Sequence, residues 1–196
     1  MKLKKTNQRW GVFGGSFDPP HLAHLLGVLY ALEATNLHRV LIIPCYIHPF
    51  QKELTPFYHR VEMCKLAFGR LKDFVEISEI EKGIEGINYT IDTIIRLKQN
   101  YPSVNFHLII GSDILDETSK WKDFERIRKE APLIILPRPS FNKVNSKYLE
   151  GFSLPPFFLP DINATTIRNL IKSGESVSQF LSPAVAEYIQ KNNIYS

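Results

Sequence analysis

The stretch that decides the fold is GVFGGSFDPPHLAHLLGVLYALEA, residues 11–34. It begins with an apolar run, turns at a pair of glycines, contains two prolines and continues with leucines at steps of three and four residues. This order is typical of a buried strand, a tight turn and an amphipathic helix. His21 and His24 fall where the turn runs into the helix. The stretch therefore predicts a strand–helix unit that carries a site at its turn.

The same alternation of strand and helix continues along the chain. Apolar runs occupy residues 9–14, 39–44, 74–78, 106–111 and 132–137. Continuous apolar runs suit strands that are buried on both faces of a sheet. Together with the helical patterns between them, they predict a single α/β domain over residues 1–196. We expect it to be Rossmann-like, with a mainly parallel sheet and helices on both faces.

Two helical patterns in succession close the sequence. Asn163 is expected to precede the first helix and Gly174 to end it, whereas Ser182 and Pro183 are expected to open the second. These signals predict a small C-terminal helical extension over about 162–196.

Spacing and caps also predict the helices between the strands. Thr55 is expected to cap a helix whose first residue is Pro56. Further helices are expected before Pro102 and over 121–130. In the helix of the opening stretch, the buried face is expected to consist of Leu22, Leu25, Leu26, Leu29 and Leu32.

The composition limits the class of protein. The net charge of +4 is spread along the 196 residues, apart from Lys2, Lys4 and Lys5, which we interpret as a solvated terminus rather than a nucleic-acid-binding arm. No signal peptide follows, and no apolar run is long enough to span a bilayer. We expect a cytoplasmic protein with no nucleic-acid or membrane partner, and assembly into a homo-oligomer stays open. Cys45 and Cys64 lack CxxC spacing and are expected to be free thiols.

Polar segments follow three of the predicted strands. They are GGSFDPPHLAH (14–24), PCYIHPFQKE (44–53) and GSD (111–113). Because ligands of open parallel sheets bind outside the carboxyl ends of the strands, we expect these segments to form one site.

The two histidines admit three interpretations. Unpaired N–H groups in the first helical turn, together with imidazole donors, suit a polyphosphate. A metal ion would need a third and a fourth ligand, and no second cluster of ligating residues has the required spacing. In a purely structural role, one histidine would cap the helix and the other would pack. The polyphosphate interpretation accounts for most of the stretch, although the spacing is neither that of a Walker A loop nor GxGxxG.

The same segment resembles a known signature. GGSFDPPHLAH is similar to the GxFxPxHxGH motif of the nucleotidylyltransferases. Later segments narrow the resemblance to the bacterial nicotinate-nucleotide adenylyltransferase family, with its SYTxDT, GSD…WK and ISxTxIR motifs. They are ISEIEKGIEGINYTIDTI (77–94), LIIGSDILDETSKWKDFERI (108–127) and INATTIRNLIKSGESVSQFLSPAVAEYIQKNNIY (162–195). The motifs occur in the family's order and span residues 11–195.

The resemblance implies an adenylyltransferase of NAD biosynthesis. In such a reaction the 5′-phosphate of nicotinate mononucleotide attacks the α-phosphorus of ATP, which gives deamido-NAD and pyrophosphate without a covalent enzyme intermediate. The attacking oxygen is already an anion, so the protein must supply positioning and charge neutralisation. The resemblance also implies Mg²⁺ that arrives with the triphosphate, and no metal site held by the protein alone.

On the ATP side, the resemblance implies three catalytic residues, His21, His24 and Arg168, which would act on the phosphates. The glycines of the implied site would allow close approach of the nucleotide, an aspartate would accept from the ribose hydroxyls, and threonines would add donors to the phosphates. The implied ATP-binding residues are Gly14, Gly15, Ser16, Phe17, Gly111, Asp113, Thr165 and Thr166.

On the side of the second substrate, the resemblance implies that Trp121 stacks on the pyridine ring. The backbone N–H groups of Tyr89 and Thr90 would meet the nicotinate carboxylate, which would explain a preference for the acid over the amide. Lys52 is the candidate substrate contact in its loop, because Gln51 occupies the place where the family has a lysine.

The sequence departs from the family pattern at three further positions. Ala23 replaces the motif glycine between the histidines, and its methyl is expected where the helix approaches the nucleotide. Ile84 lies where many relatives carry a basic residue, and Ala164 replaces a motif serine. None of these is one of the two histidines, so the chemistry is expected to be intact.

Other functions remain as alternatives. Within the enzymes, nicotinamide mononucleotide or pantetheine phosphate could be the adenylyl acceptor, although the second and third motifs argue against a pantetheine-phosphate enzyme. From a different class, the chain could be a non-catalytic nucleotide-binding or RNA-binding module. No basic stripe with exposed aromatic residues supports RNA binding.

Overall fold

The computed structural model describes residues 8–47, 53–84, 86–139 and 158–196. Within them, five strands form a sheet in the order β3–β2–β1–β4–β5, and all neighbouring strands are parallel. The strands are β1 (Gln8–Gly15), β2 (Arg39–Pro44), β3 (Val75–Ile77), β4 (Val104–Gly111) and β5 (Leu133–Leu136). Each strand overlaps a predicted apolar run, and the Rossmann-like prediction is confirmed.

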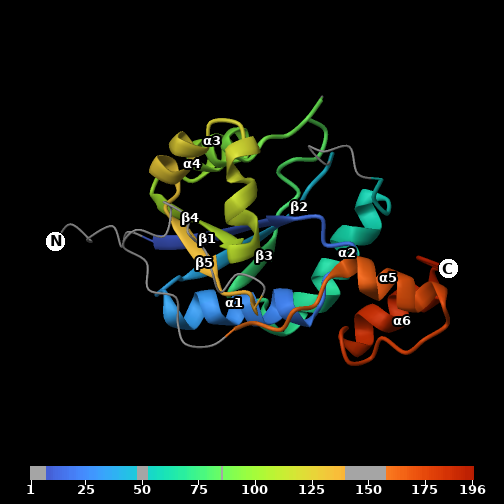
Figure 1. Cartoon of the computed structure of the whole chain (residues 1–196). Coiled ribbons are helices and arrows are strands. Elements are labelled where there is room, and N and C mark those ends of the chain that lie inside the picture. The colour runs from blue at the N-terminus through green and yellow to red at the C-terminus, as the bar shows by residue number, and fades with distance from the viewer. Residues whose placement is uncertain (1–7, 48–52, 85, 140–157) are drawn as a thin grey trace.

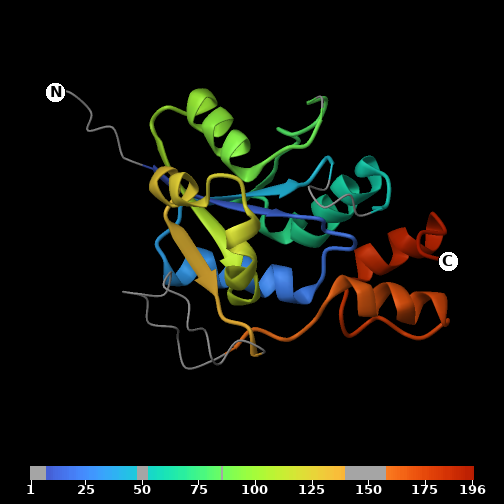
Figure 2. The same ribbon diagram turned by 45° about the horizontal axis from the view of Figure 1, so that its top comes forward.

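Helices connect the strands and cover both faces of the sheet, as predicted. α1 and α2 pack on one face, and α3 and α4 pack on the other (Figures 1 and 2). The helices are α1 (Leu22–Ala34), α2 (Phe57–Phe68), α3 (Thr90–Asn100), α4 (Phe124–Glu130), α5 (Ala164–Lys172) and α6 (Pro183–Lys191), with 3₁₀ helices η1 (Gly69–Leu71) and η2 (Ser112–Lys120).

Successive strand residues belong to different apolar layers. Val12 and Leu41 pack in the layer under α3 and α4. Their chain neighbours Phe13 and Ile42 pack in the layer under α1 and α2. Because side chains of a strand point alternately to the two faces, an apolar run without polar interruption is needed when both faces are covered.

The buried face of α1 differs from the leucine stripe that the spacing predicted. Leu22 is 38% exposed, and the fully buried positions are Ala23, Gly27, Val28 and Ala31. These small residues let the helix approach the sheet closely. A Cβ at Gly27 would lie 2.7 Å from Leu136 Cδ1, so a larger residue would require the Leu136 side chain to move. Of the predicted leucines, Leu25, Leu26 and Leu32 are only partly buried and pack against the same apolar layer.

Helix boundaries follow the local signals in most places. α3 ends at Asn100, and Ser182 and Pro183 open α6 as expected. At α2 the prediction was wrong by one residue, because Pro56 is the N-cap and the helix begins at Phe57. The helix expected over 121–130 is shorter, since Asp123 adopts φ 56° and starts α4 only at Phe124.

The C-terminal helices form an annex beside α2, as the orange and red segments of Figure 1 show. Their apolar residues, among them Ile167 and Val185, share a cluster with Met63 of α2. The Asn163 side chain accepts from Thr166 N at 2.9 Å, which fixes the start of α5. Among the described residues, no helix combines the length and the apolar character that crossing a membrane requires.

Candidate active site

The candidate active site lies at the carboxyl ends of the central strands. The sheet runs outward from β1 through β2 to β3 on one side and through β4 to β5 on the other. The order of the strands along the chain thus changes direction between β1 and β4. In open parallel sheets, ligands bind in the crevice that forms at such a point. A cavity of about 560 Å³ lies there, and its lining includes Ser16, Glu53 and Asp113. The three predicted polar segments therefore meet, as their positions after the strands indicated.

The loop after β1 combines an open end with a buried turn. A side chain at the exposed Gly14 would meet no other atom within 4 Å, so this end of the strand leaves space for a ligand. Phe17 adopts φ 48° but is only 2% exposed, and its ring lies 5.7 Å from that of Phe13. A left-handed conformation at an aromatic residue is unfavourable, and it persists here because the ring is held by the core.

His21 and His24 form a stacked pair at the start of α1. Their ring centroids are 3.7 Å apart with an interplanar angle of 30°. The backbone N–H of His21 donates to His24 Nδ1 at 3.2 Å. Because that nitrogen accepts, a neutral His24 ring carries its proton on Nε2 and presents it as a donor. His21 Nδ1 is buried and has no hydrogen-bond partner.

Both rings are held in the neutral form. Burial, followed by the nearby positive charge of Arg138, lowers the pKa of His21 to about 3. Burial, His21 and Arg138 together hold the pKa of His24 well below its usual value. The pair therefore consists of uncharged donors in the resting protein, and an arriving anion would favour their protonation.

This pKa shift makes the fold sensitive to acid. Unfolded His21 titrates near 6.5 and folded His21 near 3, so the unfolded state binds more protons between these values. His21 should thus lower the free energy of unfolding by about 1.4 kcal/mol between pH 7.5 and pH 5.5. Urea titrations give the free energy of unfolding of the wild type and of His21→Asn at both pH values. The difference between the two proteins should change by this amount from pH 7.5 to pH 5.5. Parallel pH curves for the two proteins would refute the shift.

The first turn of α1 is not the row of unpaired N–H groups that the sequence suggested. The amide of Leu22 donates to Phe180 O at 2.8 Å, and that of His24 donates to His21 O at 2.9 Å. The His21 amide is used by His24 Nδ1. At these three positions the donors for an anion must come from side chains, which gives the imidazoles a larger role.

The turn after β4 places Asp113 in the cavity lining. Its Oδ1 is buried without a hydrogen-bond partner, which leaves an acceptor available for a ligand hydroxyl. The carboxylate sits directly over Gly111, where a Cβ would collide with Oδ1. Gly111 is therefore required for the position of Asp113, and both residues lie where the sequence predicted them.

Two arginines provide positive charge in the cavity lining. Arg168 of α5 donates to Asp18 O at 2.7 Å and to Thr165 Oγ1 at 3.1 Å. Arg138 follows β5; its Nη1 donates to Pro160 O at 2.9 Å, and its Nε is buried without a partner. Sequence reasoning missed Arg138, although its place at the carboxyl end of the fifth strand was a usable signal.

Asp18 and Arg60 were also missed, and they support the loop after β1. Arg60 is 1% exposed and donates to Ser16 O, Thr55 O and Cys45 O at 2.8–2.9 Å. Its guanidinium joins the loop after β1 to the connection between β2 and α2, and both contribute residues to the cavity lining. No local sequence pattern predicts this role, because the acceptors are backbone carbonyls, which a pattern of side chains does not reveal.

Some predicted residues lie away from this cavity. Tyr89, Thr90 and Trp121 belong to the α3–α4 side of the molecule and are not in the cavity lining. Tyr89 and Trp121 pack against the same apolar layer, and Lys122 Nζ lies 4.5 Å from the Tyr89 ring centroid. Lys52 lies outside the described residues. The roles of all four residues stay predictions.

The remaining predicted positions separate into lining and supporting residues. Phe17 and Thr165 line the cavity, as Ser16 does, whereas Thr166 uses its N–H for the Asn163 cap. Ala23 is fully buried and outside the lining. Its methyl therefore packs inside the fold. The prediction that this methyl lies where the helix approaches the nucleotide was wrong.

The comparisons with known proteins agree with this geometry. A nicotinate-nucleotide adenylyltransferase of Bacillus subtilis is 35% identical over 188 residues, which cover 94% of this chain and 97% of that protein. A probable nicotinate-nucleotide adenylyltransferase of Myxococcus xanthus is 33% identical and covers 94% of this chain and 93% of its own length.

Solved structures support the fold. The Plasmodium falciparum nicotinic acid mononucleotide adenylyltransferase complexed with NaAD superposes with a TM-score of 0.84 at 23% identity, over 96% of this chain and 97% of that one. The sequence profile of the cytidylyltransferase-like family matches residues 12–175. The chain therefore belongs to the cytidylyltransferase-like family and, within it, to the nicotinate-nucleotide adenylyltransferases.

Proposed function

We propose that this chain transfers AMP from ATP to nicotinate mononucleotide and forms deamido-NAD and pyrophosphate. The observation that carries the proposal is the gathering of His21, His24, Arg138 and Arg168 around one cavity at the switch point of the sheet. Two guanidinium groups and an imidazole pair suit a triphosphate, whose charge must be offset before a second phosphate can approach. The curated relatives carry this activity in their names.

The reaction is a direct displacement at the α-phosphorus. An oxygen of the 5′-phosphate of nicotinate mononucleotide forms a bond to this phosphorus. The bond from the phosphorus to the oxygen that bridges to the β-phosphate breaks, and pyrophosphate leaves with the electron pair. The nucleophile needs no base, since it is already an anion. The work of the protein is to hold two anions in line and to neutralise their charge.

The imidazoles act at the reacting phosphate. His24 offers Nε2–H as a donor because its Nδ1 accepts from the backbone. His21 stacks against it, and its unpartnered Nδ1 is buried beside it. As charge grows on the α-phosphoryl oxygens, donors already in place stabilise it without reorganisation.

The arginines and Asp113 hold the rest of ATP. Arg168 has a guanidinium only partly used by Asp18 O and Thr165 Oγ1, so its remaining N–H groups can bind the β- and γ-phosphates. Arg138 approaches from β5 and shares this task. The unpartnered Asp113 Oδ1 accepts from a ribose hydroxyl.

The pyridine nucleotide occupies the α3–α4 side of the same sheet edge. Trp121 stacks on the pyridine, and the N–H groups of Tyr89 and Thr90 at the start of α3 bind the carboxylate. One observation supports this placement: Asn88 Nδ2, next in the chain, is buried without a partner, and Asn88 is 6% exposed. A carboxylate would satisfy this donor, whereas the amide of nicotinamide mononucleotide would satisfy it less well.

A divalent cation accompanies ATP in nucleotidyltransferases generally, and we propose Mg²⁺ for this chain. The described residues contain no group of three His, Cys, Asp or Glu side chains that could hold a metal ion. The donor set therefore fits an ion that is held mainly by the triphosphate, with carboxylates of the lining such as Asp113 nearby. When bound, such an ion would neutralise triphosphate charge.

The test is pyrophosphate release from ATP with each candidate acceptor supplied separately. We expect release with nicotinate mononucleotide, and kcat/KM about tenfold or more above that for nicotinamide mononucleotide, because the amide lacks the charge that the α3 donors bind. Product mass identifies deamido-NAD directly.

Each alternative predicts a different result in this assay. A tenfold preference for the amide or turnover only with pantetheine phosphate would replace the proposed substrate. Absence of turnover with every acceptor, with ATP binding intact, would indicate a non-catalytic nucleotide-binding module.

A further inference from the structure

The C-terminal end of the chain contacts the loop of the candidate site. The Tyr195 hydroxyl donates to Asp18 Oδ1 at 2.5 Å, across 177 positions of sequence. Asp18 is 3% exposed and lies in the cavity lining. We propose that Tyr195 is a positioning residue for the triphosphate: it holds Asp18, and through Asp18 it holds the loop after β1 and Arg168. The inference deepens the proposed function and rests on it.

The end of α6 fixes the path of the C-terminal tail, residues 193–196. Asn193 adopts φ 50° and its N–H donates to Gln190 O at 3.2 Å, while Ile194 N–H donates to Ile189 O at 3.0 Å. These two bonds form a Schellman motif, with asparagine at the left-handed position. Ile194 and Ile189 are both buried in the C-terminal apolar cluster. The tail is thus anchored just before Tyr195.

Tyr195 then turns back toward the cavity. It adopts φ 70°, a conformation that is unfavourable for an aromatic residue and needs support from its surroundings. The burial of the hydroxyl and its contact with Asp18 raise the pKa of Tyr195, so the hydroxyl keeps its proton and acts as a donor. A hydrogen bond from a hydroxyl to a carboxylate oxygen is short and stronger than one between neutral groups.

Asp18 joins three segments of the chain at one residue. Its Oδ2 accepts from Thr55 N at 3.2 Å, and its backbone oxygen accepts from Arg168 Nη1 at 2.7 Å. Its Oδ1 accepts from Tyr195. Without this donor, Asp18 Oδ1 would be buried without a hydrogen bond, which is unfavourable. The carboxylate would therefore move toward another donor. The carbonyl of Asp18 would move with it, and Arg168 would lose the contact that directs its guanidinium.

The consequence is specific for one part of the substrate. Arg168 is assigned to the β- and γ-phosphates, so a misplaced guanidinium weakens the hold on ATP and leaves the adenosine and pyridine contacts intact. AMP lacks these two phosphates. A change in the affinity for ATP without a change in the affinity for AMP is therefore the signature of this positioning role.

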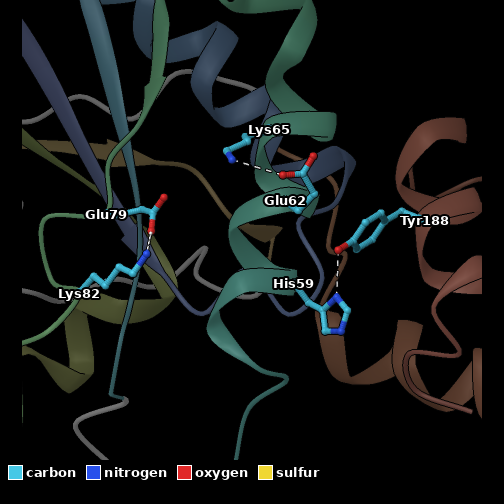
Figure 3. A network of polar contacts seen from close by, with 6 residues as sticks. All are labelled: His59, Glu62, Lys65, Glu79, Lys82 and Tyr188. Atoms are coloured by element: carbon cyan, nitrogen blue, oxygen red, sulfur yellow. Dashed lines mark hydrogen bonds and ion pairs between the residues drawn. The ribbon is translucent and has the colours of Figure 1, made fainter.

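The experiment compares two tyrosine variants of the 196-residue chain. Tyr195→Phe removes the hydroxyl that holds Asp18. The matched control is Tyr188→Phe, which removes the hydroxyl that forms a 2.9 Å hydrogen bond with His59 Nδ1 between α6 and α2 (Figure 3). Tyr188 belongs to the same apolar annex but not to the cavity lining. Calorimetry measures the dissociation constants of ATP and AMP, and steady-state kinetics measures both KM values and kcat.

For Tyr195→Phe we expect about a tenfold weaker binding of ATP and a tenfold lower kcat/KM for ATP. The affinity for AMP and the KM for nicotinate mononucleotide should stay within about twofold. Tyr188→Phe should match the wild type within about twofold in all four quantities. Deletion of Ser196 alone, whose hydroxyl contacts only Asn193 O among the described residues, should also leave them unchanged.

Two results would overturn the inference. One is equal behaviour of Tyr195→Phe and Tyr188→Phe; the other is a parallel loss of affinity for ATP and AMP, which would indicate general loosening of the fold. Both are distinct from failure of the proposed function. If the proposed function were wrong, the wild type itself would show no adenylyl transfer. The calorimetric comparison of ATP with AMP would still test the role of Tyr195.

Discussion

Replacing His24 with Asn should lower kcat for adenylyl transfer by roughly 10²- to 10³-fold while leaving the fold nearly unchanged. The two ring nitrogens have separate tasks. Nδ1 accepts from the His21 backbone N–H, and the amide oxygen of asparagine can take over this contact. The Nε2–H donor has no counterpart in asparagine, so charge on the α-phosphoryl oxygens loses its stabilisation. Steady-state kinetics, together with thermal unfolding, measures both effects.

His24→Gln is the matched variant. Its amide nitrogen can reach toward the place of Nε2, but the side chain offers no acceptor at the place of Nδ1. We expect higher kcat than in His24→Asn and a loss of roughly 1 kcal/mol of stability, because the first turn of α1 loses its cap. If His24→Asn retained kcat within about fivefold of the wild type, the imidazole would not act on the reacting phosphate.

Replacing Arg60 with Met should lower the free energy of unfolding by about 3–5 kcal/mol, which corresponds to roughly 10 °C in Tm. Methionine fills much of the same space on α2 but donates no hydrogen bond. The carbonyls of Ser16, Thr55 and Cys45 would then lose their buried donor. Because Ser16 lines the cavity and Thr55 directly follows the lining residue Leu54, we also expect weaker binding of ATP. Chemical denaturation and calorimetry measure the two losses.

Lys65→Met is the control for this substitution. Lys65 lies on the same helix, with a side chain that is 54% exposed and a 3.3 Å ion pair with Glu62 (Figure 3). Exposed pairs of this kind contribute little, so stability should change by less than about 0.5 kcal/mol. A similar loss in both variants would show that the change to methionine, and not the loss of the buried contacts, destabilises the protein.

Features with a local cause could be predicted from the sequence. All five strands were found because strands covered on both faces must be apolar throughout. The caps at Asn163 and Ser182 were found because their side chains bond within the first turn that follows them. The histidine pair and Asp113 were placed correctly because the carboxyl ends of parallel strands share one edge.

Features that depend on partners far along the chain could not be predicted. The spacing of leucines indicated a buried face for α1, but the closeness of the sheet selects small residues such as Gly27 instead. In the sequence, Arg60 looks like any charged residue of an amphipathic helix, since the carbonyls that it binds are invisible in a pattern of side chains. The contact between Asp18 and Tyr195 requires the fold to be known before either residue suggests the other.

That contact has a consequence for synthesis. The first strand and its histidines leave the ribosome early, whereas the partner of Asp18 lies 177 positions further along the chain and emerges after the five strands. Nascent domains gain structure as they are made, beginning with their N-terminal part. A nascent chain that has emerged only as far as its five strands can form the sheet but lacks the tyrosine that completes the loop. The ability to bind the triphosphate fully is therefore acquired only after Tyr195 has emerged and reached Asp18.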